Sequence, residues 1–318
     1  MQKRTLGKLE VSSLGLGCMG MSLGYGHFDD QQSIRVIRHS IDKGVTLLDT
    51  SDLYGDGHNE ALIQKALAGG LRNKVILATK CGFVSLGKVD GSPQHIKKAC
   101  DASLKRLGVD VIDLYYLHRA DKSVPIEESV GAFADLVVAG KIRYVGLSEV
   151  TVSTLKKAAA VHPITALQSE YSLWERKPEH NGVLNACQEL GIGFVPYSPL
   201  GRGFLSGYYR DTTKLEENDF RRLLPKFNGE CLKHNLQLID KLITFAKDKH
   251  CTPAQLALAW LLSQHETIVP IPGTRSIERL NENLGALEIT LSATELTEMN
   301  HWMHTMGVQY PAQHDLEV

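Results

Sequence analysis

The feature that most constrains this chain is an alternation of short apolar runs with amphipathic segments of helical spacing. The runs are rich in Val, Ile, Leu and Tyr, and several of the segments between them close on glycine, as helices often do. This alternation is typical of a parallel β-sheet covered by α-helices. The predicted strands span residues 45–49, 74–80, 111–118, 143–148, 164–169, 192–198, 267–272 and 287–290.

Eight such units predict an α/β fold, a single (β/α)8 TIM barrel, which typically needs about 250 residues. The chain has 318 residues, and its 43% hydrophobic content is sufficient for a large core. We therefore expect one domain over residues 1–318. A turn at Gly7-Lys8 predicts an N-terminal β-hairpin, and the last segment predicts a C-terminal helix. A doubly wound sheet is the alternative, and it would need a glycine fingerprint after its first buried strand.

A glycine pattern of that kind, G-x-G-x-x-G, does occur in residues 15–20, GLGCMG. It binds a dinucleotide pyrophosphate only when a buried strand precedes it and a helix follows it. Here a predicted hairpin precedes it, and Gly24 and Gly26 disfavour a helix after it. We therefore expect a glycine-rich loop at this place.

Composition limits the classes of partner. Lys and Arg (35) nearly balance Asp and Glu (36), so no global charge attracts nucleic acid or an anionic membrane. The start, MQKRTLGKLEV, has no apolar signal region, and the uncharged apolar stretches are shorter than about 18 residues. We expect a cytoplasmic protein, a monomer or homo-oligomer, that binds small molecules. The six cysteines form no C-x-x-C pair, so reduced thiols are expected.

Three polar residues end the first three predicted strands: Asp49, Lys80 and His118. In a TIM barrel the active site is built at the C-terminal ends of the strands, so these side chains would share one pocket. Each has the alternation that points it into the barrel. Tyr54, in the loop DTSDLYG after the first strand, is a fourth candidate.

These four side chains suit proton delivery to a carbonyl oxygen. A tyrosine has an ordinary pKa near 10, and a nearby ammonium is expected to lower it. Asp49 would keep Lys80 charged, Lys80 would tune Tyr54, and His118 would orient the carbonyl oxygen. The group contains no obvious nucleophile and nothing that supplies electrons, so a hydride donor is implied.

Two other features of the sequence compete with this interpretation. Asp52 could pair with Lys80, but we expect it to cap the helix that begins near His58. His301 and His304 have helical spacing that could suggest a metal, but no carboxylate or cysteine at suitable spacing supports one. We expect no metal site, which disfavours a metal-dependent hydrolase.

The segments LLDTSDLYG, VILATKCG and LYYLHR resemble segments of the aldo-keto reductase superfamily in order and spacing. The resemblance extends along almost the whole chain. It implies a TIM barrel with an N-terminal hairpin, and it assigns catalytic roles to Asp49, Tyr54, Lys80 and His118.

Further segments resemble the family's cofactor-binding regions. GLSE and LQSEY imply that Ser148 and Gln168 hold the nicotinamide carboxamide, although Glu149 stands where asparagine is common. PYSPLGRGFLSG implies that Tyr197 stacks on the nicotinamide. In the same segment the pyrophosphate would be approached by Ser198, Pro199, Leu200, Gly201, Arg202 and Gly203. GLGCMG would then lie beside the nicotinamide and the substrate.

The run IPGTRSIERLNENL resembles the family's clamp for the adenosine phosphate, which implicates Gly273, Thr274, Arg275, Arg279, Glu282 and Asn283. Arg279 would contact the 2′-phosphate of NADP, with Arg275 adding to it, and Glu282 and Asn283 would contact adenine. Gly273 stands where many relatives have lysine. Arg279 and Arg275 nevertheless predict NADPH as the cofactor, with NADH less favoured. The alternative is that Arg279 forms a surface ion pair with Glu282.

The long charged segment 201–230 resembles the branch related to potassium-channel β subunits and perakine-type reductases. The expected activity is NADPH-dependent reduction of an aldehyde or ketone to an alcohol, with hydride from the nicotinamide and a proton from Tyr54. The alternative is a cofactor-sensing regulatory subunit with little turnover.

Overall fold

Seven parallel strands form a curved sheet at the centre of the protein. The computed structural model describes residues 1–85 and 87–306, with side chains as far as Trp302. The strands follow one another around the sheet in chain order and bury the predicted apolar runs. They are β3 (Leu16–Gly17), β4 (Leu47–Asp49), β5 (Ile76–Cys81), β8 (Ile112–Leu117), β9 (Ile142–Ser148), β10 (Ile164–Glu170) and β11 (Gly193–Tyr197).

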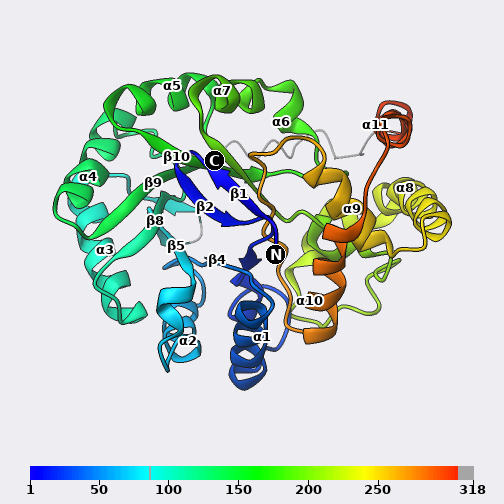
Figure 1. Cartoon of the computed structure of the whole chain (residues 1–318), viewed down its shortest axis with the longest axis horizontal. Coiled ribbons are helices and arrows are strands. Elements are labelled where there is room, and N and C mark those ends of the chain that lie inside the picture. The colour runs from blue at the N-terminus through cyan, green and yellow to red at the C-terminus, as the bar shows by residue number, and fades with distance from the viewer. Residues whose placement is uncertain (86, 307–318) are drawn as a thin grey trace.

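Helices surround this sheet, as Figure 1 shows. Several begin at side chains that accept a backbone N–H bond, among them Ser92, Thr151 and Thr252. The helices are α1 (Asp30–Asp42), α2 (His58–Ala66), α3 (Pro93–Leu107), α4 (Ile126–Val138), α5 (Val152–Val161), α6 (Lys177–His180), α7 (Val183–Leu190), α8 (Gly229–Asp248), α9 (Pro253–Leu262), α10 (Ile277–Leu284) and α11 (Ala293–Met306). The architecture is the predicted TIM barrel.

Residues 267–273 close the barrel between β11 and β3. On one side the Phe194 N–H donates to the Thr267 carbonyl (3.0 Å), and on the other the Gly15 N–H donates to the Pro270 carbonyl (2.9 Å). Pro270 and Pro272 have no N–H, so this segment pairs through isolated bridges rather than as a regular strand. The predicted strand at 267–272 therefore occupies the expected place with weaker pairing.

The prediction of a strand at 287–290 is wrong. Residues Gly285–Glu288 form a 3-10 turn after α10 instead. Three strands were missed. Two of them, β6 (Phe83–Ser85) and β7 (Lys88–Val89), pair with each other outside the barrel sheet, and the third, β3, consists of only two residues inside the glycine-rich segment. Gly17 allows close approach there, because any Cβ at this position would lie 2.7 Å from the Ile271 carbonyl oxygen.

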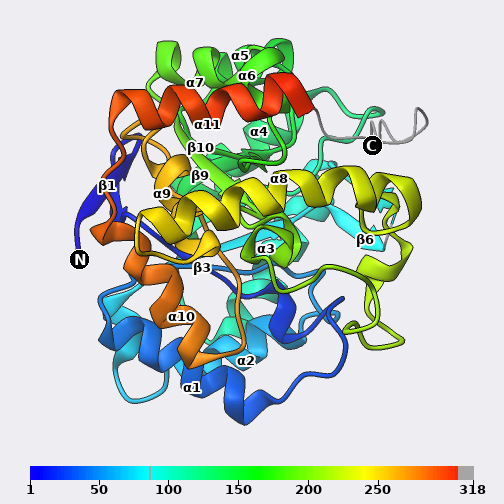
Figure 2. The same cartoon turned by 90° about the vertical axis from the view of Figure 1, so that its right-hand side faces the viewer.

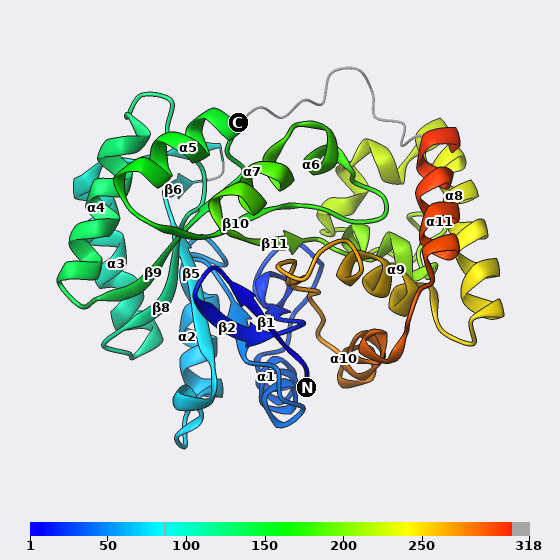
Figure 3. The same ribbon diagram turned by 45° about the horizontal axis from the view of Figure 1, so that its top comes forward.

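The predicted N-terminal hairpin, β1 (Lys3–Leu6) and β2 (Leu9–Ser12), covers the N-terminal end of the barrel. In Figure 3 it lies against the middle of the sheet. Leu6, Leu9 and Val11 join an interior cluster whose other members come from the strands and from the closing segment: Leu47, Ala78, Leu114, Tyr116, Ala166, Val195, Val269 and Ile271. Because this end is plugged, the opposite end is the place for a site.

The segment 201–230 folds into short 3-10 turns that contact the loop after β3. The Phe220 N–H donates to the Gly24 carbonyl (3.0 Å), and the His27 N–H donates to the Glu216 carboxylate (2.9 Å). Beyond it, α8 and α11 lie side by side on the outside of the molecule (Figure 2). Among the described residues, no helix is long and apolar enough to cross a membrane.

The barrel closure at Gly17 is testable. We expect Gly17→Ala to lower the free energy of unfolding by about 1–3 kcal/mol, because the added methyl group would push Ile271 away. Urea denaturation followed by circular dichroism measures this change. Gly131→Ala is the control, because a Cβ at this position in α4 meets nothing within 4 Å. Alanine is favoured over glycine inside a helix, so this change should raise the free energy of unfolding by about 0.5–1 kcal/mol. Equal effects of the two changes would contradict this account of closure.

Candidate active site

The four predicted residues meet at the C-terminal end of the barrel. Asp49 is the last residue of β4, Lys80 lies near the end of β5, and His118 directly follows β8. All three side chains are buried, and Tyr54 reaches them from the loop between β4 and α2. The parallel register explains this convergence, since neighbouring strands end at the same edge of the sheet.

A buried ion pair holds the group together. The Lys80 Nζ atom donates to Asp49 Oδ1 (2.5 Å), to the Thr50 carbonyl (2.8 Å) and to Tyr54 Oη (3.3 Å). These acceptors match the three hydrogens of an ammonium group. The other oxygen of Asp49 accepts from Gln168 Nε2 (2.8 Å). Asp49 thus fixes Lys80, and both of its carboxylate oxygens accept a hydrogen bond.

The pKa values of Lys80 and Tyr54 are set by opposing effects. Burial by itself would lower the pKa of Lys80, but Asp49 and Tyr54 outweigh it, so the pKa is raised and the ammonium stays charged. Burial raises the pKa of Tyr54, and Lys80 offsets only part of that rise. The expectation of a pKa below the ordinary value was therefore wrong in its net direction, because enclosure of the phenol outweighs the cation. At neutral pH Tyr54 keeps its proton.

His118 is neutral and is held from one side. Burial, followed by the positive charges of Lys80 and Arg119, lowers its pKa well below the ordinary value. The Nδ1 atom lies 3.1 Å from the Ser51 hydroxyl. The ring stands edge to face with Tyr54 and Phe83, at centroid distances of 6.0 and 4.8 Å. The ring is thereby oriented with its Nε2 atom away from Ser51.

Sequence reasoning missed three residues of this site. Ser51 contacts His118, and Asp52 accepts from the Ser51 hydroxyl (3.2 Å). The prediction that Asp52 caps a helix is wrong, because α2 begins after Gly57, a residue with a left-handed backbone. Arg119 donates to Ser148 Oγ (3.0 Å) and to the His118 carbonyl (2.7 Å). Its position directly after His118 was the signal that could have found it.

The residues predicted to hold the nicotinamide lie beside the four catalytic candidates described above, which are called the tetrad from here on. Ser148 and Gln168 are direct register partners on β9 and β10, so a hydroxyl and a carboxamide stand next to each other. Left-handed backbone occurs nearby at three residues that are not glycine: Glu149 (φ 50°) directly after β9, and Ser198 (φ 48°) and Arg202 (φ 59°) after β11. Such strain is often concentrated at ligand sites.

The segment after β11 brings its predicted residues to the same edge. Tyr197 ends β11, and Ser198, Pro199 and Leu200 lead into the turn that contains Gly201, Arg202 and Gly203. Arg202 and Lys226 share the Glu170 carboxylate, at 3.2 and 3.3 Å. This contact joins the turn to the far end of segment 201–230.

The residues of the predicted adenosine clamp lie in the loop before α10 and along the helix itself. Gly273 and Thr274 precede it, Ser276 caps it, and Arg279 lies in its first turn with its guanidinium 4.8 Å from the Tyr208 ring centroid. Arg275 donates to the carbonyls of Tyr25 and His27. Glu282 is partly exposed and Asn283 is buried at the end of the same helix.

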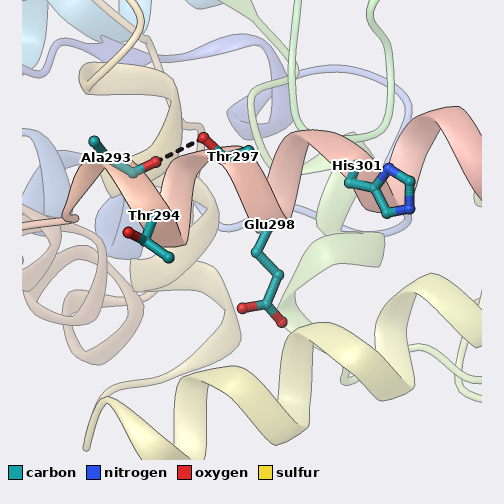
Figure 4. A pocket seen from close by; sticks show the side chains of 5 residues that line it. All are labelled: Ala293, Thr294, Thr297, Glu298 and His301. Atoms are coloured by element: carbon teal, nitrogen blue, oxygen red, sulfur yellow. Dashed lines mark hydrogen bonds between the residues drawn. The ribbon is translucent and has the colours of Figure 1, made fainter.

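A separate hollow lies on α11, far along the chain from these residues. Ala293, Thr294, Thr297, Glu298 and His301 line it, and Glu298 points toward α8 (Figure 4). Its lining comes from one helix and includes none of the strand-end side chains. His304 lies outside the residues whose side chains are described. Within the described part of the chain, no group of three or more His, Cys, Asp or Glu residues is arranged to hold a metal ion.

Comparison with known proteins agrees with this geometry. The model of the aldo/keto reductase family matches residues 13–302. A protein named probable aldo-keto reductase 1 from Glycine max is 47% identical over 295 residues, which cover 91% of this chain and 85% of that protein.

Two solved structures are similar along nearly their whole length. The thermostable aldo-keto reductase Tm1743, crystallised with the inhibitor epalrestat, is 31% identical with a TM-score of 0.75, covering 95% of this chain and 99% of its own. The glycerol dehydrogenase AKR11B4 from Gluconobacter oxydans is 27% identical with a TM-score of 0.88, covering 98% of both chains.

Proposed function

This chain belongs to the aldo-keto reductase family, and on that premise we propose that it reduces an aldehyde or ketone to an alcohol with NADPH. The observation that supports the proposal most directly is the contact of 3.3 Å between the Lys80 ammonium and the Tyr54 hydroxyl, both of which are buried. A protonated phenol next to a fixed cation is suited to giving a proton to an oxygen that becomes negative.

The residues around the tetrad fit a nicotinamide cofactor. When bound, NADPH supplies the hydride that these side chains cannot provide. The paired Ser148 hydroxyl and Gln168 carboxamide offer donors and acceptors for the carboxamide of the nicotinamide. Tyr197 offers a ring for stacking, and the left-handed turn at residues 198–203 would bring backbone N–H groups toward the pyrophosphate.

The four central side chains have distinct roles in this proposal. Tyr54 donates its hydroxyl proton to the carbonyl oxygen of the substrate. Lys80 stabilises the phenolate that results, and Asp49 holds Lys80 in place. His118, which is neutral, hydrogen bonds the same oxygen and fixes its position. The substrate is a small carbonyl compound.

The preference for NADPH over NADH rests on Arg279. Its guanidinium stands at the start of α10, where a helix N-terminus and a planar cation together favour a phosphate. Arg275 is already bonded to two backbone carbonyls, so its main role is to hold the loop that contains Tyr25 and His27. Glu282 and Asn283 lie on the same helix for contact with adenine.

The proton-donor role predicts the behaviour of Tyr54→Phe. This change removes the hydroxyl group and keeps the ring, so we expect the kcat of NADPH-dependent aldehyde reduction to fall by at least about 100-fold. The loss of NADPH absorbance with a panel of aldehydes and ketones measures it. Binding of NADPH, followed by its fluorescence, should stay within a few fold of the wild type.

The same assay separates an enzyme from a cofactor sensor. Turnover that is abolished by Tyr54→Phe supports the reductase. Tight NADPH binding combined with negligible turnover of every carbonyl compound in the wild-type protein would contradict it and favour a regulatory subunit.

The phosphate contact predicts a selective effect of Arg279→Ala. We expect the Kd of NADPH to rise about 10- to 100-fold, as is typical for loss of a charge-assisted contact, while the Kd of NADH changes little. Fluorescence titration with both cofactors measures the two values. If both weaken equally, Arg279 does not contact the 2′-phosphate.

A further inference from the structure

A hydroxyl and a carboxyl group form a chain behind His118. The Ser51 Oγ atom lies 3.1 Å from His118 Nδ1 and 3.2 Å from Asp52 Oδ1, and it accepts a bond from the Leu53 N–H (3.2 Å). Ser51 is fully buried and His118 is 8% exposed. Water therefore has little access to the contact between Ser51 and His118, which must be satisfied within the chain, whereas Asp52 is half-buried.

The hydrogen count of a hydroxyl allows two arrangements. A serine hydroxyl donates once and accepts twice, and Leu53 already uses one of its acceptor sites. When Asp52 is ionised, Ser51 donates to it and accepts from an N–H at His118 Nδ1. When Asp52 is protonated, it donates to Ser51, and Ser51 donates to an unprotonated Nδ1. Every donor and acceptor of the serine is satisfied in both cases.

The two arrangements differ at the opposite side of the imidazole ring. A neutral histidine carries one ring hydrogen, so a hydrogen on Nδ1 leaves Nε2 as an acceptor, and its absence from Nδ1 makes Nε2 a donor. A carbonyl oxygen needs a donor, whereas an alcohol hydroxyl can donate to an acceptor. The protonation of Asp52 thus selects which form of the substrate His118 can bind.

We propose that Ser51 and Asp52 are positioning residues that set the tautomer of His118 and thereby the direction of the reaction that the site favours. Protonated Asp52 produces the form for carbonyl reduction, and ionised Asp52 produces the form for alcohol oxidation. The change between them releases one proton: Nε2 loses its hydrogen, Nδ1 takes the hydrogen of Ser51, and Ser51 takes that of Asp52. This inference rests on the proposed carbonyl reduction.

The surroundings of Asp52 place its titration in a useful range. Burial, and after it the negative charge of Glu60, raises the pKa of Asp52 to about 7, while Arg106 acts in the opposite direction. The titratable and charged groups that face Asp52 come from α2, α3, β5 and β8, and they are Glu60, Arg106, Cys81 and Tyr115. Glu60 itself is anchored by Arg106 Nε (2.6 Å) and by the Thr79 hydroxyl (2.6 Å).

The sign of the pH dependence follows from this pKa. Below about pH 7 Asp52 is protonated and the reductive form prevails; above it the oxidative form prevails. We expect kcat/KM for carbonyl reduction to fall, and kcat/KM for alcohol oxidation to rise, by up to about tenfold per pH unit as the pH passes 7. Asp52→Asn can hydrogen bond in both senses but cannot ionise, so the bend near pH 7 should disappear from both profiles. The ratio of the two kcat/KM values must still change about tenfold per pH unit, because reduction consumes one proton.

Matched variants separate this role from a structural one. Ser51→Ala breaks the chain and should also remove the bend near pH 7 from both profiles, even if Asp52→Asn fails to fold. Asp56→Asn makes the same acid-to-amide change at an exposed residue of the same loop and should keep the wild-type profile. A loss of kcat that is equal at every pH, with the wild-type profile retained in Asp52→Asn, would overturn the proposal.

The tautomer itself can be read in the NADP⁺-loaded protein by NMR of ¹⁵N-labelled histidine, with His118 assigned by the loss of its signals in His118→Asn. We expect the hydrogen to move from Nε2 to Nδ1 as the pH rises through about 7 in the wild type, and to show no such move in Asp52→Asn. A tautomer that is constant between pH 5 and 9 would overturn the proposal. Because no carbonyl substrate is present, this result is independent of whether the protein reduces carbonyl compounds.

Discussion

The buried ion pair between Lys80 and Asp49 is the interaction on which the site depends. Its members come from adjacent strands, and the lysine also bonds the Thr50 carbonyl and Tyr54. Such a pair adds little to stability, because desolvation of both charges offsets their attraction, but removal of one partner costs about 3–5 kcal/mol. The pair therefore links β4 to β5, and the bond from Lys80 to Tyr54 joins the Tyr54 loop to them. Gln168 extends this link to β10.

Around this pair, enclosure keeps the two groups nearest the proposed substrate uncharged. Burial raises the pKa of Tyr54 and lowers that of His118. A protonated phenol and a neutral imidazole thus stand beside one fixed cation. Negative charge that develops on a substrate oxygen would meet Lys80 through Tyr54, in a pocket where water screens little. The hairpin plugs the opposite end of the barrel, so the strand ends around Asp49 and Lys80 are the end that is available for a site.

The sequence predicted the parts of the structure that repeat. Apolar runs located β4, β5, β8, β9, β10 and β11, and a polar residue at the end of a run located Asp49, Lys80 and His118. Periodicity could not find β3, because two residues are too short to show a period. It wrongly predicted a strand at 287–290, because a short apolar run does not ensure that a neighbouring strand is there to pair with it. The net pKa of Tyr54 depends on enclosure by distant segments, and the role proposed for Asp52 depends on His118, which reaches Ser51 from another strand end. The nearby lysine suggested a lowered pKa for Tyr54, which is the wrong direction, and the helix-cap preference of aspartate suggested the wrong role for Asp52.

The central claim is that Lys80 controls the ionisation of Tyr54, and it can be measured directly. Tyrosine labelled with ¹³C at Cζ reports ionisation by NMR, and among the 10 tyrosines the signal of Tyr54 is the one missing from Tyr54→Phe. The account predicts a pKa for Tyr54 above the ordinary value in the wild type and a higher one still in Lys80→Met, with no change in Lys88→Met, where the lysine is exposed. A Tyr54 pKa that is the same in wild type and Lys80→Met would contradict it.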